Sequence, residues 1–267
     1  MRHRTVSANG IRLHVAEAGS GPLTLMLHGF PEFWWTWRHQ LPALAAHGRH
    51  AVAVDLRGYG KSDKTPRGYD GWTLAGDVAG LIKALGARRA HLVGHGWGGV
   101  LAWTTAALHP RLVESVTTIS APHPLEIPLR TLLKAQPPFW PERRLVADDA
   151  AVIERLLRAW TGPQWTVDPE VLRRTREAML IRGVPHSSME YFRWAFRSRL
   201  RGDGRDFKKA VCRPLEATVL RLRGEHDART SPITRFAPYR VIDDAGHFPQ
   251  WERPDAVTAL LLGTGAG

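Results

Sequence analysis

The chain is poor in cysteine, lysine and tyrosine, and it has no long apolar run. Its single cysteine, Cys212, excludes an internal disulfide and favours a reducing compartment. No stretch approaches the roughly 18 uncharged apolar residues that a membrane span needs. The first residues also lack the apolar region of a signal peptide. We therefore expect a cytoplasmic protein that does not enter a membrane.

The scarcity of lysine bears on the strong positive charge. Only six of the 37 basic residues are lysines, and the formal net charge is +12. A charge of this size is compatible with an anionic partner. However, the arginines are spread along the chain, and abundant arginine and alanine with little lysine is typical of a GC-rich genome. The sequence therefore gives no indication of nucleic-acid binding, and it carries no feature that sets the oligomeric state.

Short apolar segments alternate with helical patterns along most of the chain. Asn9-Gly10 favours a turn with positive φ, so the N-terminal segments Thr5–Ser7 and Ile11–Glu17 should form a hairpin. Further strands are predicted at Leu23–Leu27, Ala51–Asp55, Ala90–Val93, Val116–Ile119, Ala217–Leu222 and Arg240–Ile242. Helices are predicted at Trp34–Ala46, Thr73–Leu85, Gly98–Leu108 and Asp255–Leu262. This order predicts an α/β fold with a mostly parallel central sheet, helices on both faces and ligands at the carboxyl ends of the strands.

Residues 125–209 interrupt this alternation. They read as mostly helical, contain no strand pattern, and begin with a proline-rich segment, Gln136–Pro141. Because the region lies between two predicted strands, we expect an inserted helical cap. The core would then comprise residues 1–124 and 210–267.

The strongest local motif is Val93–Gly99, which follows a predicted strand and opens a predicted helix. Its frame is that of a nucleophile elbow, in which a strained central residue presents its side chain above the sheet between two glycines. The central residue here is Gly96, which has no side chain to offer. Taken alone, a glycine-rich turn is a weak signal, since similar turns bind phosphates.

The loop His28–Pro31 follows the first core strand. In elbow-containing folds this loop and the residue after the nucleophile supply the backbone N–H groups of an oxyanion hole. The corresponding donors here are Phe30 and Trp97. A simple turn is the alternative interpretation of His28–Pro31.

An acid and a histidine follow the last two predicted strands. Asp227 and His247 complete the chain order nucleophile, acid, base. Asp227 would hold one nitrogen of the His247 ring, which fixes the tautomer and leaves the other nitrogen free as a general base. Glu225, Asp243 and Asp244 are alternative acids.

Five segments resemble the epoxide hydrolases and their haloalkane-dehalogenase relatives: His28–His39, Asp55–Ser62, Val93–Gly99, Pro122–Pro124 and Gly246–Pro254. The resemblance covers essentially the whole chain and is weakest in residues 125–209. It implies an α/β-hydrolase fold and a chemistry that needs no cofactor and no metal. In that family an aspartate at the Gly96 position attacks the epoxide carbon, and a histidine-activated water hydrolyses the resulting ester. Tyrosines of the cap hydrogen-bond the epoxide oxygen.

Three departures from the family pattern matter. Gly96 cannot form an ester. The expected cap contains one tyrosine, Tyr191, and the family's donor position falls on Phe192. Only 19 residues separate Asp227 from His247, which is short for the family and indicates that a helix between them is trimmed.

We therefore expect an epoxide-hydrolase-like enzyme that acts on a small apolar substrate with the Asp227–His247 dyad as general base. The expected pocket includes His28, Pro31, Trp34, Tyr191 and Phe192, with Phe139 and Trp140 as further aromatic candidates. Two alternatives stay open: an inactive homologue that binds a ligand, and an ordinary epoxide hydrolase from which the nucleophile was removed. Deliberate removal would more often introduce asparagine or alanine than glycine, which favours a naturally divergent protein.

Overall fold

A twisted sheet forms the centre of the molecule. The computed structural model describes residues 1–263, and in them eight strands lie in the order β1-β2-β4-β3-β5-β6-β7-β8. Their bounds are β1 (Arg2–Ala8), β2 (Ile11–Ala18), β3 (Leu23–Leu27), β4 (His50–Val54), β5 (Ala90–His95), β6 (Val113–Ile119), β7 (Thr218–Gly224) and β8 (Arg240–Ile242). The β1–β2 hairpin turns at Asn9-Gly10, where both residues have positive φ. Strand β2 is antiparallel to β4, and the six strands β3 to β8 are parallel to one another.

The parallel register brings several loops together at one edge. Leu27 at the end of β3 pairs with Gly94 of β5, and His95 pairs with Ile119 at the end of β6. Gly224 at the end of β7 pairs with Ile242 of β8. All these strands end at the same edge, as the sequence predicts for a ligand-binding α/β sheet.

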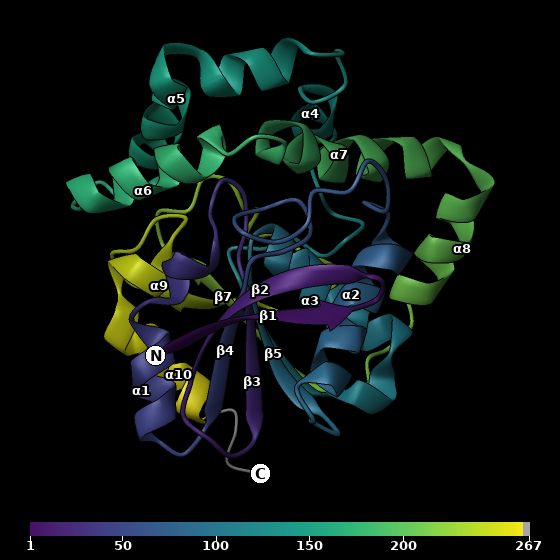
Figure 1. The fold of residues 1–267 in the computed structure, drawn as a ribbon, viewed down its shortest axis with the longest axis vertical. Coiled ribbons are helices and arrows are strands. Elements are labelled where there is room, and N and C mark those ends of the chain that lie inside the picture. Colours follow the sequence, from purple (N-terminus) through teal and green to yellow (C-terminus); the bar gives the residue numbers. More distant parts are fainter. Residues whose placement is uncertain (264–267) are drawn as a thin grey trace.

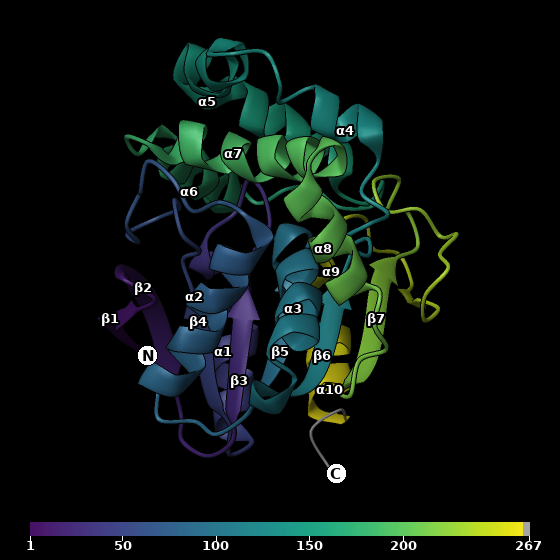
Figure 2. The same ribbon diagram turned by 90° about the vertical axis from the view of Figure 1, so that its right-hand side faces the viewer.

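Helices cover both faces of the sheet (Figures 1 and 2). One face carries α1 (Gln40–Ala46) and α10 (Pro254–Gly263), and the other carries α2 (Gly71–Ala84) and α3 (Trp97–Leu108). Successive strand side chains point to opposite faces. Leu25 and Leu92 accordingly pack with the α2/α3 side, whereas Met26 and Val93 pack with the α1/α10 side. The sequence prediction of an α/β sheet buried on both faces is confirmed.

The predicted helix Trp34–Ala46 is wrong as a single element. The structure has a short 3-10 helix, Trp34–Trp37, followed by α1, which begins at Gln40. Pro42 explains the break. Proline is tolerated in the first turn of a helix, where the N–H groups have no partner in the helix, but it disrupts a helix interior. A helix running through the whole segment would place Pro42 in its interior.

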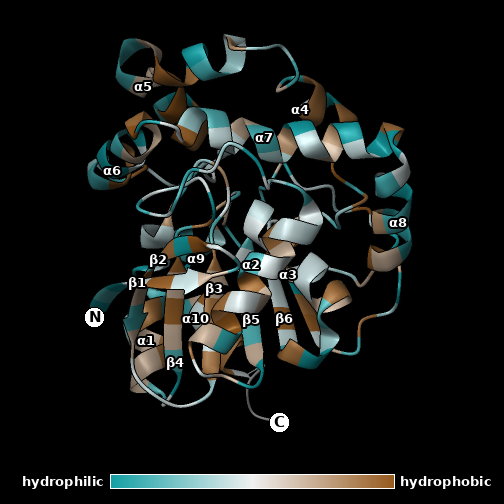
Figure 3. Cartoon of the chain, turned by 45° about the vertical axis from the view of Figure 1, so that its right-hand side comes forward, coloured by the Kyte–Doolittle hydropathy of each residue, from teal (hydrophilic) through white to brown (hydrophobic). Residues whose placement is uncertain are grey.

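A layer of helices lies between β6 and β7 in sequence, above the carboxyl edge of the sheet (Figures 1 and 3). It comprises α4 (Leu129–Leu133), α5 (Trp140–Trp160), α6 (Pro169–Leu180), α7 (Val184–Arg197) and α8 (Gly202–Val211). Helix α5 is interrupted at residues 147–150, where the backbone is not helical. The predicted boundary at residue 209 falls inside α8, which descends beside α3 and continues to Val211.

A buried arginine holds part of this layer together. Arg193 of α7 donates to the carbonyl oxygen of Ala135 at 2.9 Å and pairs with Glu142 of α5 at 2.6 Å. The ion pair joins two helices that are far apart in sequence.

Within residues 1–263, no helix is both long enough and apolar enough to cross a bilayer.

Candidate active site

The turn between β5 and α3 has the geometry of a nucleophile elbow. Gly96 lies at φ +50° and ψ −116°, a backbone conformation that residues other than glycine rarely adopt. A Cβ atom on Gly94 would lie 2.2 Å from the carbonyl oxygen of Gly98, and one on Gly98 would lie 2.1 Å from that of Leu27. Both flanking positions therefore require glycine. At Gly96 itself a Cβ would meet only the Cα of Gly29, at 3.7 Å, so there is space for a side chain.

Asp227 and His247 form a direct contact. The Oδ1 atom of Asp227 lies 3.0 Å from Nδ1 of His247, although no helix separates the two residues along the chain. Asp227 also accepts from the backbone N–H groups of Arg229 and Thr230. Burial would raise the pKa of Asp227, but the neighbouring His247 and these hydrogen bonds lower the pKa to about 2.

The alternative acids point elsewhere. Glu225 is exposed and accepts from the backbone N–H of Asp244, whose own carboxylate pairs with Arg253 at 2.5 Å. Asp243 is exposed. Among the described acids, Asp227 alone has a recorded contact with the ring of His247.

A second buried pair lies beneath the dyad and was not singled out from the sequence. Nδ1 of His95 lies 2.5 Å from Oε2 of Glu32, and Nε2 of His95 lies 2.8 Å from the carbonyl oxygen of His247. Burial opposes a charge on His95, but Glu32 outweighs it and raises the pKa of the imidazole. Both ring nitrogens then donate, so the pair holds the backbone of His247 in place. The sequence did contain a positional signal for this pair, because Glu32 directly follows Pro31 of the loop His28–Pro31 and His95 directly precedes Gly96.

Glu32 lies at the centre of a wider network. Its carboxylate accepts from the hydroxyl of Thr36, from Nε2 of Gln250 at 3.1 Å and from the N–H of Gly29 at 3.3 Å. Burial alone would raise the pKa of Glu32, but His95 and these donors lower it to about 2. The network connects the loop after β3 to the segment that follows His247.

The loop of the base is also tied to the helical layer. The N–H of His247 donates to the carbonyl oxygen of Trp160, the last residue of α5, at 2.7 Å. One carboxylate oxygen of Glu252 accepts from Gly162 and from Gly246, each at 2.8 Å. These three bonds join the end of α5 to the turn that carries the base.

A cavity of about 80 Å³ lies at the dyad and the elbow. His247, Gly96, Phe30 and Trp97 line it, with Phe192 from α7. The N–H groups of Phe30 and Trp97 have no recorded acceptor in residues 1–263. Both predicted oxyanion donors therefore belong to residues at the same cavity as the predicted base.

One hydroxyl group at this cavity lacks a partner. The Oγ of Ser120, a buried residue at φ +47° after β6, has no hydrogen-bond partner in the described chain. Buried polar atoms are normally paired, so this hydroxyl needs a partner in the cavity. Water or a polar group of a ligand would supply one.

Several predicted pocket residues lie elsewhere. The imidazole of His28 is fully buried and occupied, since Nε2 accepts from the N–H of Leu56 and Nδ1 contacts the oxygen of Gly29. Pro31 is buried and does not line the cavity, and Trp34 packs against His14. The sequence prediction is wrong for these three, because their side chains turn into the core or toward β1 and β2.

Tyr191 and Phe192, the two residues of α7 predicted for the pocket, point in different directions. Phe192 faces the cavity and packs against Phe30 and Trp97, with ring centroids 5.6 and 5.0 Å apart. Tyr191 points away, and its hydroxyl donates to the carbonyl oxygen of Arg57 at 2.8 Å. Phe139 and Trp140, the further aromatic candidates, are 73% and 55% exposed. They line neither the cavity beside His247 nor the larger cavity behind Trp97.

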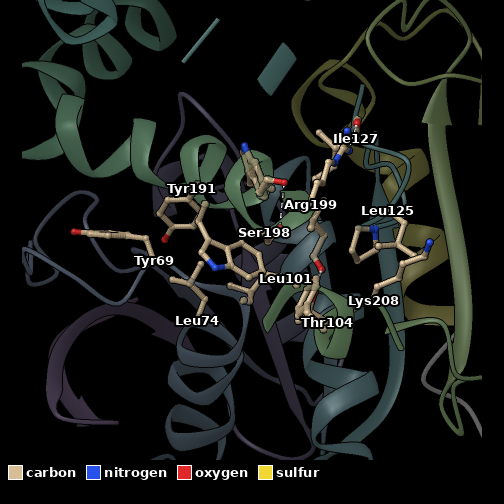
Figure 4. Close-up of a pocket in the computed structure, with 18 of the residues that line it drawn as sticks. Tyr69, Leu74, Leu101, Thr104, Leu125, Ile127, Tyr191, Ser198, Arg199 and Lys208 are labelled. Atoms are coloured by element: carbon tan, nitrogen blue, oxygen red, sulfur yellow. Dashed lines mark hydrogen bonds between the residues drawn. The ribbon is translucent and has the colours of Figure 1, made fainter. Parts of the chain in front are cut away.

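A larger cavity of about 390 Å³ lies on the far side of Trp97, between α3 and helices α7 and α8 (Figure 4). Trp97, Val100 and Ile127 line both cavities, so they form the wall between them. The larger space is therefore adjacent to the dyad but does not contain it.

The described residues contain one group of possible metal ligands. Glu225, His226 and Asp244 present ligand atoms within 4.8 Å of one another, but the group is at the surface and its acids have the partners given above. His91 and His95 have the spacing H-x-x-x-H. They lie on β5, and His91 contacts the hydroxyl of Thr117 while His95 contacts Glu32.

Comparison with known proteins places this chain in a family. A family model described as alpha/beta hydrolase fold matches residues 22–254. Epoxide hydrolase A of Mycobacterium tuberculosis (strain ATCC 25618 / H37Rv) is 31% identical, with 97% of this chain and 95% of that protein covered. The AB hydrolase superfamily protein YfhM of Bacillus subtilis (strain 168) is also 31% identical, with 96% and 95% covered. The chain belongs to the α/β-hydrolase family.

Within that family the chain resembles the epoxide hydrolases over nearly its whole length. The crystal structure of epoxide hydrolase A from Mycobacterium thermoresistibile superposes with a TM-score of 0.84 at 28% identity, covering 98% of this chain and 97% of that one. Epoxide hydrolase 3 of Siraitia grosvenorii is 42% identical, but the match spans only 45% of this chain and 39% of that protein.

Proposed function

We propose that the protein is a hydrolase that opens a small apolar epoxide by direct attack of water, with His247 as general base and no covalent ester. The observation that carries the proposal is the 3.0 Å contact of Asp227 with His247 beside the empty side-chain position at Gly96. The base and its orienting acid are kept, whereas the atom that would form an ester is absent.

In the proposed step, His247 accepts one proton from water and returns it to the opened ring. Nε2 of His247 takes a proton from water as the water oxygen bonds to an epoxide carbon and the C–O bond of the ring breaks. The charge on His247 is stabilised by Asp227. The developing alkoxide is stabilised by the N–H groups of Phe30 and Trp97, and it then receives the proton from His247 to give a diol.

The cavity supports a water nucleophile. A cavity of about 80 Å³ is several times larger than the minimum space that a single water needs. The unpaired hydroxyl of Ser120 offers a hydrogen bond that would orient such a water. We further propose that α4–α8 act as the cap over this site, and that the protein works in the cytoplasm.

The test is turnover of a panel of small epoxides in water enriched in oxygen-18, with the diol and the intact protein both weighed by mass spectrometry. We expect labelled diol from the first turnover, no adduct on the protein, and no diol with His247→Ala. Diol formation that survives His247→Ala would contradict the general-base mechanism.

A second candidate is a ligand-binding protein without catalysis. It is favoured by the size of the larger cavity, which exceeds the space at the dyad about fivefold. Absence of turnover across the panel, together with saturable binding of apolar ligands, would support it.

A further inference from the structure

The 390 Å³ cavity behind Trp97 has a distinct chemical character. Its walls are mainly apolar, with Leu74, Leu101, Trp194, Ala195 and Phe207 among the lining residues. The lining hydroxyls are all engaged: Thr104 and Ser198 donate to backbone carbonyl oxygens three or four residues earlier, and Tyr69 and Tyr191 donate to carbonyl oxygens of the core. A volume of this size is typical of small-molecule sites. The body of any occupant is therefore apolar.

Three cations line the same cavity, namely Arg199, Arg205 and Lys208, and no lining residue is an aspartate or glutamate. None of the three lies within 4 Å of a carboxylate in residues 1–263. Nearby acids are engaged by other partners, since Asp203 pairs with Arg201 and Asp206 with Lys209.

Several other arginines of the helical layer do have a carboxylate partner. Arg173, Arg174, Arg176 and Arg193 each pair with a carboxylate at 2.6 or 2.7 Å. Arg199 has only a carbonyl oxygen, that of Ile127, at 2.6 Å. Partial burial lowers the pKa of Arg199, and no acid counteracts that effect. An anion would supply the missing partner.

We propose that this cavity binds an amphiphilic monocarboxylate, with the carboxylate at Arg199, Arg205 and Lys208 and the apolar part directed inward. Figure 4 shows Arg199 and Lys208 toward one end of the cavity and Tyr69 at the other. Arg199 and Lys208 therefore lie toward the same side of the cavity, as a ligand with one polar head requires (Figure 4). Trp97 lines both this cavity and the cavity beside His247. The binding does not depend on catalysis.

The test compares three ligands that share a twelve-carbon chain: dodecanoate, 1-dodecanol and dodecylammonium, each as monomer, by titration calorimetry. We expect saturable binding with dodecanoate tightest and dodecylammonium weakest. The variant Arg199→Gln/Arg205→Gln/Lys208→Gln should weaken dodecanoate binding by about tenfold or more, the effect of losing a charged hydrogen bond. It should leave 1-dodecanol binding within about twofold.

A matched control removes the same charge elsewhere. Lys83→Gln/Arg88→Gln/Arg111→Gln changes three exposed cations at the opposite edge of the sheet, and binding of both ligands should be unchanged. Ala195→Trp fills the cavity and should abolish binding of both. Because the three glutamine substitutions lie on exposed side chains, their result stands even if Ala195→Trp does not fold.

Three outcomes would overturn the proposal. The first is equal affinity for the acid and the alcohol in the unmodified protein. The second is an equal loss of dodecanoate affinity in the control variant, which would indicate a general charge effect. The third is binding to vesicles of phosphatidylglycerol without binding of monomeric dodecanoate, which would assign the cations to a membrane surface.

Discussion

The edge of the sheet and the helical layer above it differ in the groups that they bring to the cavity beside Gly96. At the edge, a chain of contacts runs from Asp227 through His247 and His95 to Glu32. In the layer, the position facing the cavity is Phe192, and the phenol of Tyr191 is engaged with a backbone carbonyl. The groups around His247 are therefore tied together by hydrogen bonds, whereas the side chain that α7 presents to the cavity, Phe192, has no hydrogen-bonding group.

The largest expected effect comes from removing the base. His247→Ala should lower any hydrolytic rate by about 10²- to 10⁴-fold, the usual contribution of general acid–base catalysis. Steady-state assays of diol formation measure it. His226→Ala, at an exposed histidine of the neighbouring loop, serves as the control and should keep full activity. A loss shared by both variants would remove the distinction between the dyad and its surroundings.

Next is the buried pair beneath the dyad. Glu32→Gln leaves a charged His95 without its partner and should lower the free energy of unfolding by about 3–5 kcal/mol. Glu154→Gln breaks a more exposed pair on α5 and should cost at most about 1 kcal/mol. Urea denaturation of both variants gives the comparison. Equal losses would show that the pair contributes no more than a surface contact.

The same pair predicts a pH dependence. The raised pKa of His95 gives stability that is present below the ordinary value of 6.5 and lost as the pH rises through the raised value. The pKa of Glu32, lowered to about 2, gives stability that is present above 4.5 and lost as the pH falls toward 2. The contribution of the pair should therefore be largest between pH 4.5 and 6.5. Glu32→Gln should flatten the stability profile, and an unchanged profile would contradict this assignment.

A smaller effect tests the elbow. Gly96→Asp should lower stability by about 1–3 kcal/mol, because a side chain there is strained at φ +50°. The open space should nevertheless accept it, so that slow esterification by an epoxide becomes detectable by mass spectrometry. Phe192→Tyr added to it should speed esterification, and His247→Ala added to it should trap the ester. Gly96→Ala carries similar strain without the carboxylate and should form no adduct. An adduct with Gly96→Ala would place the reaction elsewhere.

The smallest effect concerns Tyr191. Tyr191→Phe removes one buried hydrogen bond and should cost about 0.5–1.5 kcal/mol of stability while leaving the rate unchanged. Phe196→Leu, at a half-buried position of the same helix, controls for general loosening of α7. A tenfold fall in rate for Tyr191→Phe alone would show that the phenol reaches the substrate after all.

Sequence alone predicts the strands, the glycine frame of the elbow and the contact between Asp227 and His247, because these follow from periodicity, turn chemistry and chain order. It does not predict the direction of side chains that leave a loop. His28 belongs to the loop at the site, yet its ring turns into the core, whereas Glu32 nearby turns beneath the base. Such directions depend on contacts between segments distant in the chain, as Gln250 with Glu32 illustrates.

The bonds between the end of α5 and the turn of the base have a mechanical consequence. The N–H of His247 donates to Trp160, and the carboxylate of Glu252 accepts from both Gly162 and Gly246. Because of these bonds, we expect the end of α5 and the turn that carries His247 to move together. Lifting the layer here would swing the base away from Asp227. Helix α8 lies on the opposite side of the molecule from α9 (Pro249–Glu252), so we expect any opening of the layer that keeps His247 aligned to occur on the side of α8 (Figure 1).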